Sequence, residues 1–218
     1  MTPTDKRAAI VEAALELDRL GLNQGSTGNI SLRDGDALLI TPSGVPAQRL
    51  RSDEIARVSL DDATSGFDGP LPPSSEWRFH RDILRARADV NAVVHTHSHY
   101  ATALTTLRRD LPAVHYMIAA FETCVIRCTD YAAYGTPELS ALAVAGLGQA
   151  QGVLLGNHGA IVTGADLSRA LWRAGELESL ARTYYLATLA GVPVILSDAE
   201  IEATIPRFKN YGPRAAQE

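Results

Sequence analysis

The chain has 218 residues, of which 46% are hydrophobic and 21% are charged, and this composition is typical of a globular protein with one domain or two small ones. The formal net charge of −5 argues against nucleic-acid binding, which needs a basic face, although backbone N–H groups can still bind phosphate. Residues 1–20 lack the apolar core of a signal peptide, and no apolar run is long enough to span a bilayer. We therefore expect a cytoplasmic protein that does not enter a membrane.

Helical and strand-like hydrophobic patterns alternate along the whole chain. Caps, prolines and apolar periodicity predict helices over 3–20, 74–88, 100–107, 136–148, 166–190 and 197–210. Strands are predicted over 25–32, 37–41, 57–60, 91–97, 124–129 and twice within 152–162, and a long loop over 61–73. The Asp34-Gly35 turn joins the first two strands into a hairpin. These elements predict a single α/β domain over residues 1–218, a sheet flanked by helices.

The chain has two cysteines, Cys124 and Cys128, on one predicted strand. A disulfide within a strand is strained, and disulfide-stapled secreted proteins usually carry more cysteines. We expect two buried free thiols.

Two histidines, His95 and His97, follow a buried apolar run. Residues two apart on a strand project to the same face, so both imidazoles can bind one metal ion. His99 continues the alternation, but we expect it in the loop or first helical turn that follows. His80 and His115 have no partner at metal-ligand spacing and are expected on a surface helix and in a loop.

A third imidazole, His158, lies in the segment Gly156-Asn157-His158-Gly159 between two apolar strands. Small residues around a histidine let the backbone approach another group closely. His158 is therefore the natural third ligand, since a catalytic zinc commonly takes three protein ligands and keeps a position open.

Ser74, Ser75 and Glu76 stand at a predicted helix start, where hydroxyls and free N–H groups can bind an anion. The simpler alternative is a helix cap with an acidic first turn; Glu76 can also be a base or a fourth metal ligand. Two further loops, 25–29 and 41–44, are small, hydroxyl-rich and glycine-containing. Each alone is an ordinary turn, but three such loops together indicate a phosphate site.

Five motifs, taken in their order along the chain, resemble those of the class II aldolase/adducin family. The motifs are Gly28-Asn29, Thr41-Pro42-Ser43-Gly44, Ser74-Ser75-Glu76, His95-Thr96-His97 and Asn157-His158-Gly159, within a similarity that runs from Asn23 to Tyr211. The segments 111–119, 131–136 and 208–212 are most similar to the ketose-1-phosphate aldolases of the family. The resemblance implies that the central sheet is mainly antiparallel.

The resemblance also implies an active site. It implies one zinc per subunit, with another divalent metal possible, held by His95, His97, His158 and, in the free enzyme, Glu76. It implies a phosphate site formed by Asn29, Ser43, Gly44, Ser74 and Ser75. Glu76 would be the acid/base at the ketone-phosphate carbon. Tyr116 would be the acid/base at the aldehyde oxygen of a neighbouring subunit's site, and Tyr134 and Tyr211 would line the aldehyde pocket.

The implied protein is a homotetramer with sites between subunits. The implied reaction is cleavage of a ketose 1-phosphate, of the L-fuculose type, to dihydroxyacetone phosphate and a small aldehyde such as L-lactaldehyde. The alternatives within the family are a metal-dependent sugar-phosphate 4-epimerase or dehydratase. The sequence Ser-Ser-Glu, rather than Ser-Ser-Asp, favours the aldolase. An adducin-type interaction module is a third alternative, but it predicts missing ligands, whereas the complete set is present. Asn157 departs from the pattern, because the aldolases have a second histidine there.

Overall fold

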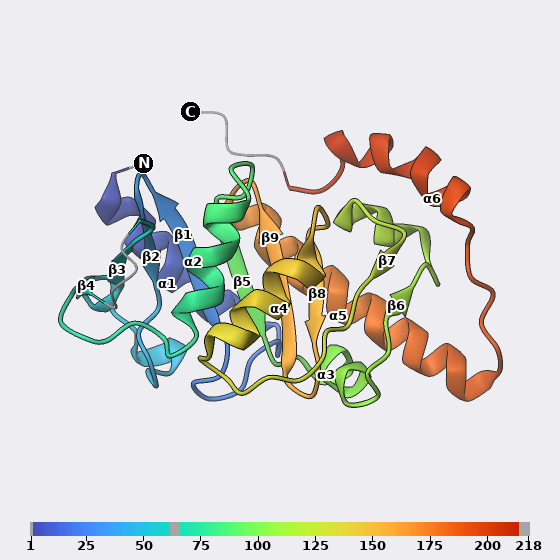
Figure 1. Cartoon of the computed structure of the whole chain (residues 1–218), viewed down its shortest axis with the longest axis horizontal. Helices are drawn as coiled ribbons and strands as arrows, with labels where there is room; N and C mark the ends of the chain where they lie inside the picture. Colours follow the sequence, from blue (N-terminus) through green and yellow to red (C-terminus); the bar gives the residue numbers. More distant parts are fainter. Residues whose placement is uncertain (1, 62–65, 214–218) are drawn as a thin grey trace.

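A seven-stranded sheet forms the centre of the protein in the computed structural model, which describes residues 2–61 and 66–213 (Figure 1). Its order is β4-β3-β2-β1-β5-β9-β8, and each neighbouring pair of strands is antiparallel. The strands are β1 (Asn29–Asp34), β2 (Ala37–Ile40), β3 (Ala56–Ser59), β4 (Phe67–Asp68), β5 (Ala92–Thr96), β8 (Gly152–Leu155) and β9 (Gly159–Gly164). The predicted fold class, one domain with a mainly antiparallel sheet flanked by helices, is confirmed.

Helices cover both faces of this sheet (Figure 1). The helices α1 (Pro3–Arg19), α3 (His99–Thr106) and α5 (Leu167–Ala190) share one core, and α2 (Trp77–Ala86) and α4 (Pro137–Leu147) share the other. Strand alternation divides the apolar residues between them, so that Leu39 enters the first core and its neighbours Leu38 and Ile40 enter the second. In the described part of the chain, no helix has the length and apolar character needed to cross a membrane.

Smaller elements complete the chain. A two-stranded sheet of β6 (Leu111–Pro112) and β7 (Val125–Ile126) lies at the end of the molecule where α6 (Asp198–Thr204) is found (Figure 1). The 3-10 helices are η1 (Ala47–Arg49), η2 (Ser52–Glu54), η3 (Tyr116–Phe121) and η4 (Ile205–Asn210). A capping box of Ser197 and Glu200 starts α6, at the start of the helix predicted from 197.

Several predicted boundaries are wrong. Strand β1 begins at Asn29 rather than at 25, and α6 ends at Thr204, where η4 replaces the rest of the helix predicted to 210. Helix α2 begins at Trp77, with Glu76 rather than Ser74 at the N-cap position, because Ser74 N donates to Thr41 O in an extended pairing of two loops. The predicted strand 124–129 is shortened to β7. Cys124 and Cys128 are free but only half-buried. Four residues of the predicted loop 61–73, at 62–65, lie outside the described residues.

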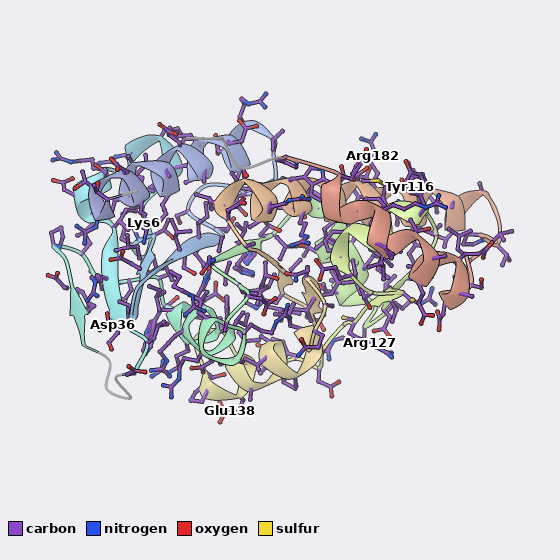
Figure 2. All side chains as sticks on the ribbon, turned by 90° about the horizontal axis from the view of Figure 1, so that it is seen from above. Lys6, Asp36, Tyr116, Arg127, Glu138 and Arg182 are labelled. Carbon is purple, nitrogen blue, oxygen red and sulfur yellow. The ribbon has the colours of Figure 1, made fainter. Side chains whose placement is uncertain are left out.

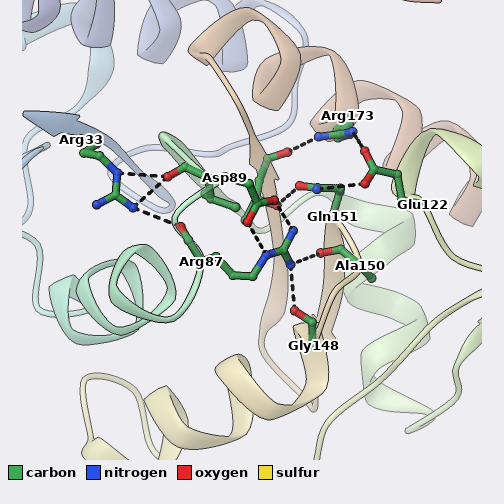
Figure 3. A network of polar contacts seen from close by, with 10 residues as sticks. Arg33, Arg87, Asp89, Glu122, Gly148, Ala150, Gln151 and Arg173 are labelled. Atoms are coloured by element: carbon green, nitrogen blue, oxygen red, sulfur yellow. Dashed lines mark hydrogen bonds and ion pairs between the residues drawn. The ribbon is translucent and has the colours of Figure 1, made fainter. Parts of the chain in front are cut away.

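A polar network built on two buried arginines holds the edge of the sheet opposite β4, near the start of β8 (Figure 3). Arg87, which is 6% exposed, donates to Gly148 O and Ala150 O at 2.8 and 3.1 Å and pairs with both carboxylate oxygens of Asp89. Arg173 similarly donates to two backbone carbonyls and to Glu122. These guanidinium groups donate hydrogen bonds to backbone carbonyls that have no described backbone N–H partner near the ends of the regular elements.

Candidate active site

Four predicted metal ligands lie at one end of the central strands. His95 is in β5, His97 follows that strand, His158 lies in the turn between β8 and β9, and Glu76 precedes α2. Antiparallel pairing of β5 with β9 brings the histidines together, although they come from distant parts of the sequence. One ligand atom from each residue lies within 4.8 Å of all the others. The three imidazole rings have centroids 4.8–4.9 Å apart.

The His95 ring is oriented by a backbone carbonyl. Its Nδ1 lies 2.9 Å from Ala160 O, and because a carbonyl only accepts, Nδ1 carries the proton. The lone pair of His95 Nε2 therefore faces His97 Nε2 at 2.9 Å and Glu76 Oε2 at 3.3 Å. Complete burial lowers the pKa of His95 to about 3, so the ring is neutral at pH 7 and its Nε2 is available as a metal ligand.

Glu76 brings negative charge to the same point. Its Oε1 is buried and makes no hydrogen bond to any residue that the structure describes, although His158 Nε2 lies 3.1 Å away. Burial by itself would raise the pKa of this carboxyl, but attraction to the protonated forms of His95 and His158 and a hydrogen bond from Asn29 outweigh it and hold the pKa well below its usual range. An ionised carboxylate beside converging imidazole nitrogens fits a divalent cation, and this donor set suits zinc.

The glycine after His158 is required by this packing. A Cβ on Gly159 would lie 2.4 Å from Thr96 O, 2.9 Å from His97 Cδ2 and 3.2 Å from His95 Cε1. The close approach expected from the small residues around His158 is therefore present, and it is made to the strand that carries the other two imidazoles.

The three predicted donor loops also meet. Ser43 N donates to Pro72 O, Ser74 N donates to Thr41 O, and Pro42 pairs with Pro73. The third loop, 25–29, lines a hollow together with Thr41 and Pro42. Gly44 has the left-handed φ of 72° that turns its loop. Ser43 is exposed and Ser74 is buried, with Ser74 Oγ accepting from Glu76 N.

The opening to the metal ligands is a hollow of about 310 Å³. It is lined by Ser75, Glu76, His97, Tyr131, Ala132, Tyr134, Asn157 and His158. Tyr134 is 71% exposed at its edge. Asn157 has a left-handed φ of 53°, and its Oδ1 accepts from Arg108 Nε.

Tyr116 and Tyr211 line a different hollow, of about 370 Å³, with Thr204, Arg207 and Phe208. Both tyrosines are half-exposed, and the Phe208 ring lies between them, with centroids 6.3 Å from Tyr116 and 5.0 Å from Tyr211. Figure 2 shows Tyr116 at the surface, near the helices at the end of the molecule that is distant from Lys6 and Asp36. A single copy of the chain therefore places these tyrosines and the metal ligands in separate hollows.

The prediction for His80 is wrong: it is fully buried rather than on a surface helix. It contacts Asn29 Oδ1 and Ser31 Oγ beneath the metal ligands. The available signal was its position four residues after Glu76, which places both residues on one side of a helical turn. Asn23 was also missed; its Oδ1 accepts from His97 N. His115 caps η3 from a loop, and His99 opens α3, as expected.

Comparison with known proteins identifies the family. The Class II Aldolase and Adducin N-terminal domain family matches residues 8–185, and the chain belongs to this family. It is 47% identical to L-fuculose phosphate aldolase of Escherichia coli K12 over 94% of both chains. It is 45% identical to 5-methylthioribulose-1-phosphate/5-deoxyribulose-1-phosphate aldolase of Rhodospirillum rubrum, over 96% of this chain and 93% of the relative.

A solved structure of an L-fuculose 1-phosphate aldolase superposes with a TM-score of 0.90 at 35% identity, covering 94% of this chain and 96% of that one. The chain is therefore a class II aldolase similar to the L-fuculose-phosphate aldolases, as its motifs predicted. Two differently named aldolases are almost equally similar to it, so similarity alone does not choose the sugar.

Proposed function

We propose that the protein is a zinc-dependent aldolase that cleaves a ketose 1-phosphate, of the L-fuculose 1-phosphate type, to dihydroxyacetone phosphate and a small aldehyde such as L-lactaldehyde. The observation that carries the proposal is the convergence of Glu76 with the imidazoles of His95, His97 and His158. These residues would hold one divalent ion per subunit, zinc or a similar metal. When bound, the ion supplies Lewis-acid polarisation of the ketone oxygen.

Glu76 is the acid/base at the ketone-phosphate carbon. In the direction of carbon–carbon bond formation, its carboxylate removes a proton from that carbon, and in cleavage it returns the proton. The lowered pKa keeps this carboxyl ionised at neutral pH, which is the form that can accept a proton. A positioned acid or base contributes about 10²–10⁴-fold in rate.

Asn29, Ser43, Gly44, Ser74 and Ser75 form the phosphate site. The pairing of loop 41–44 with residues 72–74 supports this assignment, since it brings two hydroxyl-bearing loops together, although the N–H groups of Ser43 and Ser74 are used in the pairing itself. A fixed phosphate orients the ketone carbon toward the carboxylate and lowers the entropic cost of reaction.

Tyr116 is the acid/base at the aldehyde oxygen, and Tyr134 and Tyr211 line the aldehyde pocket. Tyr134 already lines the hollow of the metal ligands, but Tyr116 and Tyr211 line another. We therefore propose a homotetramer in which the half-exposed Tyr116 of one subunit enters the site of its neighbour.

Metal analysis and a substrate panel test the proposal. L-fuculose 1-phosphate, 5-methylthioribulose 1-phosphate and 5-deoxyribulose 1-phosphate are assayed for release of dihydroxyacetone phosphate, with ribulose 5-phosphate as the test for an epimerase. We expect release from at least one ketose 1-phosphate, loss of activity on chelation, and recovery with zinc. Epimerisation without cleavage would instead establish the alternative chemistry, and activity that survives complete metal removal would exclude the metal role.

A further inference from the structure

A chain of four buried side chains lies beneath the metal ligands and ends on Glu76. Ser31 Oγ lies 2.7 Å from His80 Nδ1, His80 Nε2 lies 2.5 Å from Asn29 Oδ1, and Asn29 Nδ2 lies 2.9 Å from Glu76 Oε2. Ser31 and His80 are fully buried, and Asn29 and Glu76 are 6% and 7% exposed. With so little access to water, each group depends on its protein partner.

The direction of each hydrogen bond follows from the carboxylate. Ionised Glu76 only accepts, so Asn29 must turn its amide N–H toward it and its carbonyl oxygen toward His80. His80 Nε2 therefore carries the proton and donates. His80 Nδ1 is left with a lone pair, which accepts from the Ser31 hydroxyl. All three donors point toward Glu76.

We propose that His80 is a positioning residue that acts through Asn29 to hold the Glu76 carboxylate toward the three imidazoles. The inference rests on the metal site of the proposed function. Glu76 and His80 are four residues apart at the start of α2, so they meet the Asn29 amide from two sides. Asn29 is also the β-sheet partner of His95. The chain of hydrogen bonds thus fixes helix and strand in one geometry.

The surroundings of His80 exclude proton transfer as its task. Burial lowers its pKa to about 3, so the ring stays neutral at the pH at which an aldolase works. The Phe79 ring stacks on it with centroids 4.7 Å apart and fixes its plane. A neutral imidazole with both nitrogens engaged and its plane fixed is a rigid hydrogen-bond donor.

Two substitutions separate this role from simple packing. His80→Gln keeps an N–H donor near the position of Nε2, whereas His80→Asn has a shorter amide that reaches only the position of Nδ1. The dissociation constant for zinc is measured on metal-free protein by competition with a chromophoric chelator. We expect His80→Asn to weaken zinc binding about 10–100-fold and His80→Gln to stay within about threefold of the wild type. Urea unfolding of the metal-free proteins identifies any general loss of stability.

A double-mutant cycle tests the route through Asn29. Asn29→Ala weakens zinc binding in its own right, and His80→Asn should add less than about threefold in that background because the coupled contact is already lost. Ser31→Ala removes a single hydroxyl and tests the same chain of hydrogen bonds if His80→Asn does not fold. We expect it to weaken zinc binding about three- to tenfold.

Unchanged zinc affinity in His80→Asn or Ser31→Ala would overturn the inference. A His80→Gln variant with a zinc affinity as low as that of His80→Asn would also overturn it, because packing of the ring rather than its N–H donor would then maintain zinc binding. If the losses of zinc affinity in His80→Asn and Asn29→Ala were fully additive, His80 would not act through Asn29. Failure of the wild-type chain to bind zinc is a separate result that overturns the proposed function itself.

Discussion

Glu76 Oε2 lies 3.3 Å from His95 Nε2, yet the two residues do not form an ion pair at neutral pH. His95 donates from Nδ1 to Ala160 O and its pKa is lowered to about 3 by burial, so Nε2 presents a lone pair to a carboxylate. Two electron-rich atoms held this close are mutually unfavourable unless a cation lies near both. This relationship underlies the predictions for the site.

Replacing Glu76 by Gln keeps the size of the side chain and removes its charge and basicity. We expect the rate of ketose 1-phosphate cleavage to fall about 10²–10⁴-fold, because no other carboxylate is in the predicted ligand set. Steady-state kinetics give the rate, and circular dichroism shows that the fold is retained. Cleavage at near wild-type rate by a folded variant would remove Glu76 from its proposed role.

Tyr116→Phe removes one hydroxyl from a half-exposed ring. If Tyr116 handles the proton on the aldehyde oxygen, cleavage should slow about 10²–10⁴-fold, while exchange of the dihydroxyacetone phosphate proton with deuterium, which needs only Glu76, changes much less. NMR follows the exchange. Tyr185→Phe on α5 is the matched control and should change neither rate. Equal losses of cleavage and exchange would argue against the assignment.

Gly159→Ala should damage the metal site through contact alone. Its Cβ would lie 2.4 Å from Thr96 O and 2.9 Å from the His97 ring, so β9 must move away from β5. We expect zinc affinity to fall about tenfold or more. Gly175→Ala, in α5 with no described atom beyond the neighbouring helix backbone within 4 Å of its Cβ, is the control: it should leave zinc affinity unchanged and stabilise the helix by about 0.5–1 kcal/mol. Normal zinc binding by Gly159→Ala would show that this contact relaxes freely.

The buried His80 makes the metal-free protein sensitive to acid. Its folded pKa is about 3, below the ordinary value of 6.5, so between these pH values the unfolded chain binds a proton that the folded chain does not. This contribution to stability is complete above pH 6.5 and is lost as the pH falls toward 3. His80→Gln removes it, so near pH 5 the slope of unfolding free energy against pH should be smaller by about 1.4 kcal/mol per pH unit. Urea titrations across pH 4–7 measure the slope; parallel curves for the two proteins would contradict the prediction.

Arg87→Met tests the polar network near β8. The change leaves Gly148 O and Ala150 O without their buried donor, and each unpaired acceptor costs about 1–3 kcal/mol. Arg51→Met, which removes an ion pair with Asp53 between two exposed side chains, should cost less than about 1 kcal/mol. Urea unfolding compares the two. Similar losses in both variants would mean that the carbonyls find other partners.

Much of the fold was predictable because local signals coincide with the folded elements. Thr136-Pro137 starts α4, Ser197 caps α6, and continuous apolar runs mark β2 and β5. The boundary of α2 was not predictable, because the pairing of Ser74 with Thr41 is a contact between distant loops that overrides a good local cap. Strand 124–129 was shortened for a similar reason: Cys128 N donates to Asp110 Oδ1 and Thr129 N to Leu154 O, outside regular pairing with β6.

The site residues divide in the same way: local patterns predicted some of them, and contacts between distant segments determine the others. The alternation of His95 and His97 is local and therefore visible in sequence, and His158 stood out through its glycine neighbours. His80 did not, because its spacing of four residues from Glu76 places both on one side of a helical turn without showing that this side is buried. Its burial depends on β1 presenting Ser31 and Asn29 to that side of α2. The location of Tyr116 relative to the metal ligands depends on assembly, which a single chain does not contain.

The position of β5 between β1 and β9 has a consequence for folding. Glu76, His95 and His158 become neighbours only after strands from both halves of the chain have paired, and such non-local pairing is slow to form because long loops must close first. A folding intermediate without β9 would lack His158 and its turn. The rate at which tight zinc binding returns during refolding would therefore report when β9 docks beside β5. Zinc would also stabilise the complete fold relative to an intermediate without β9.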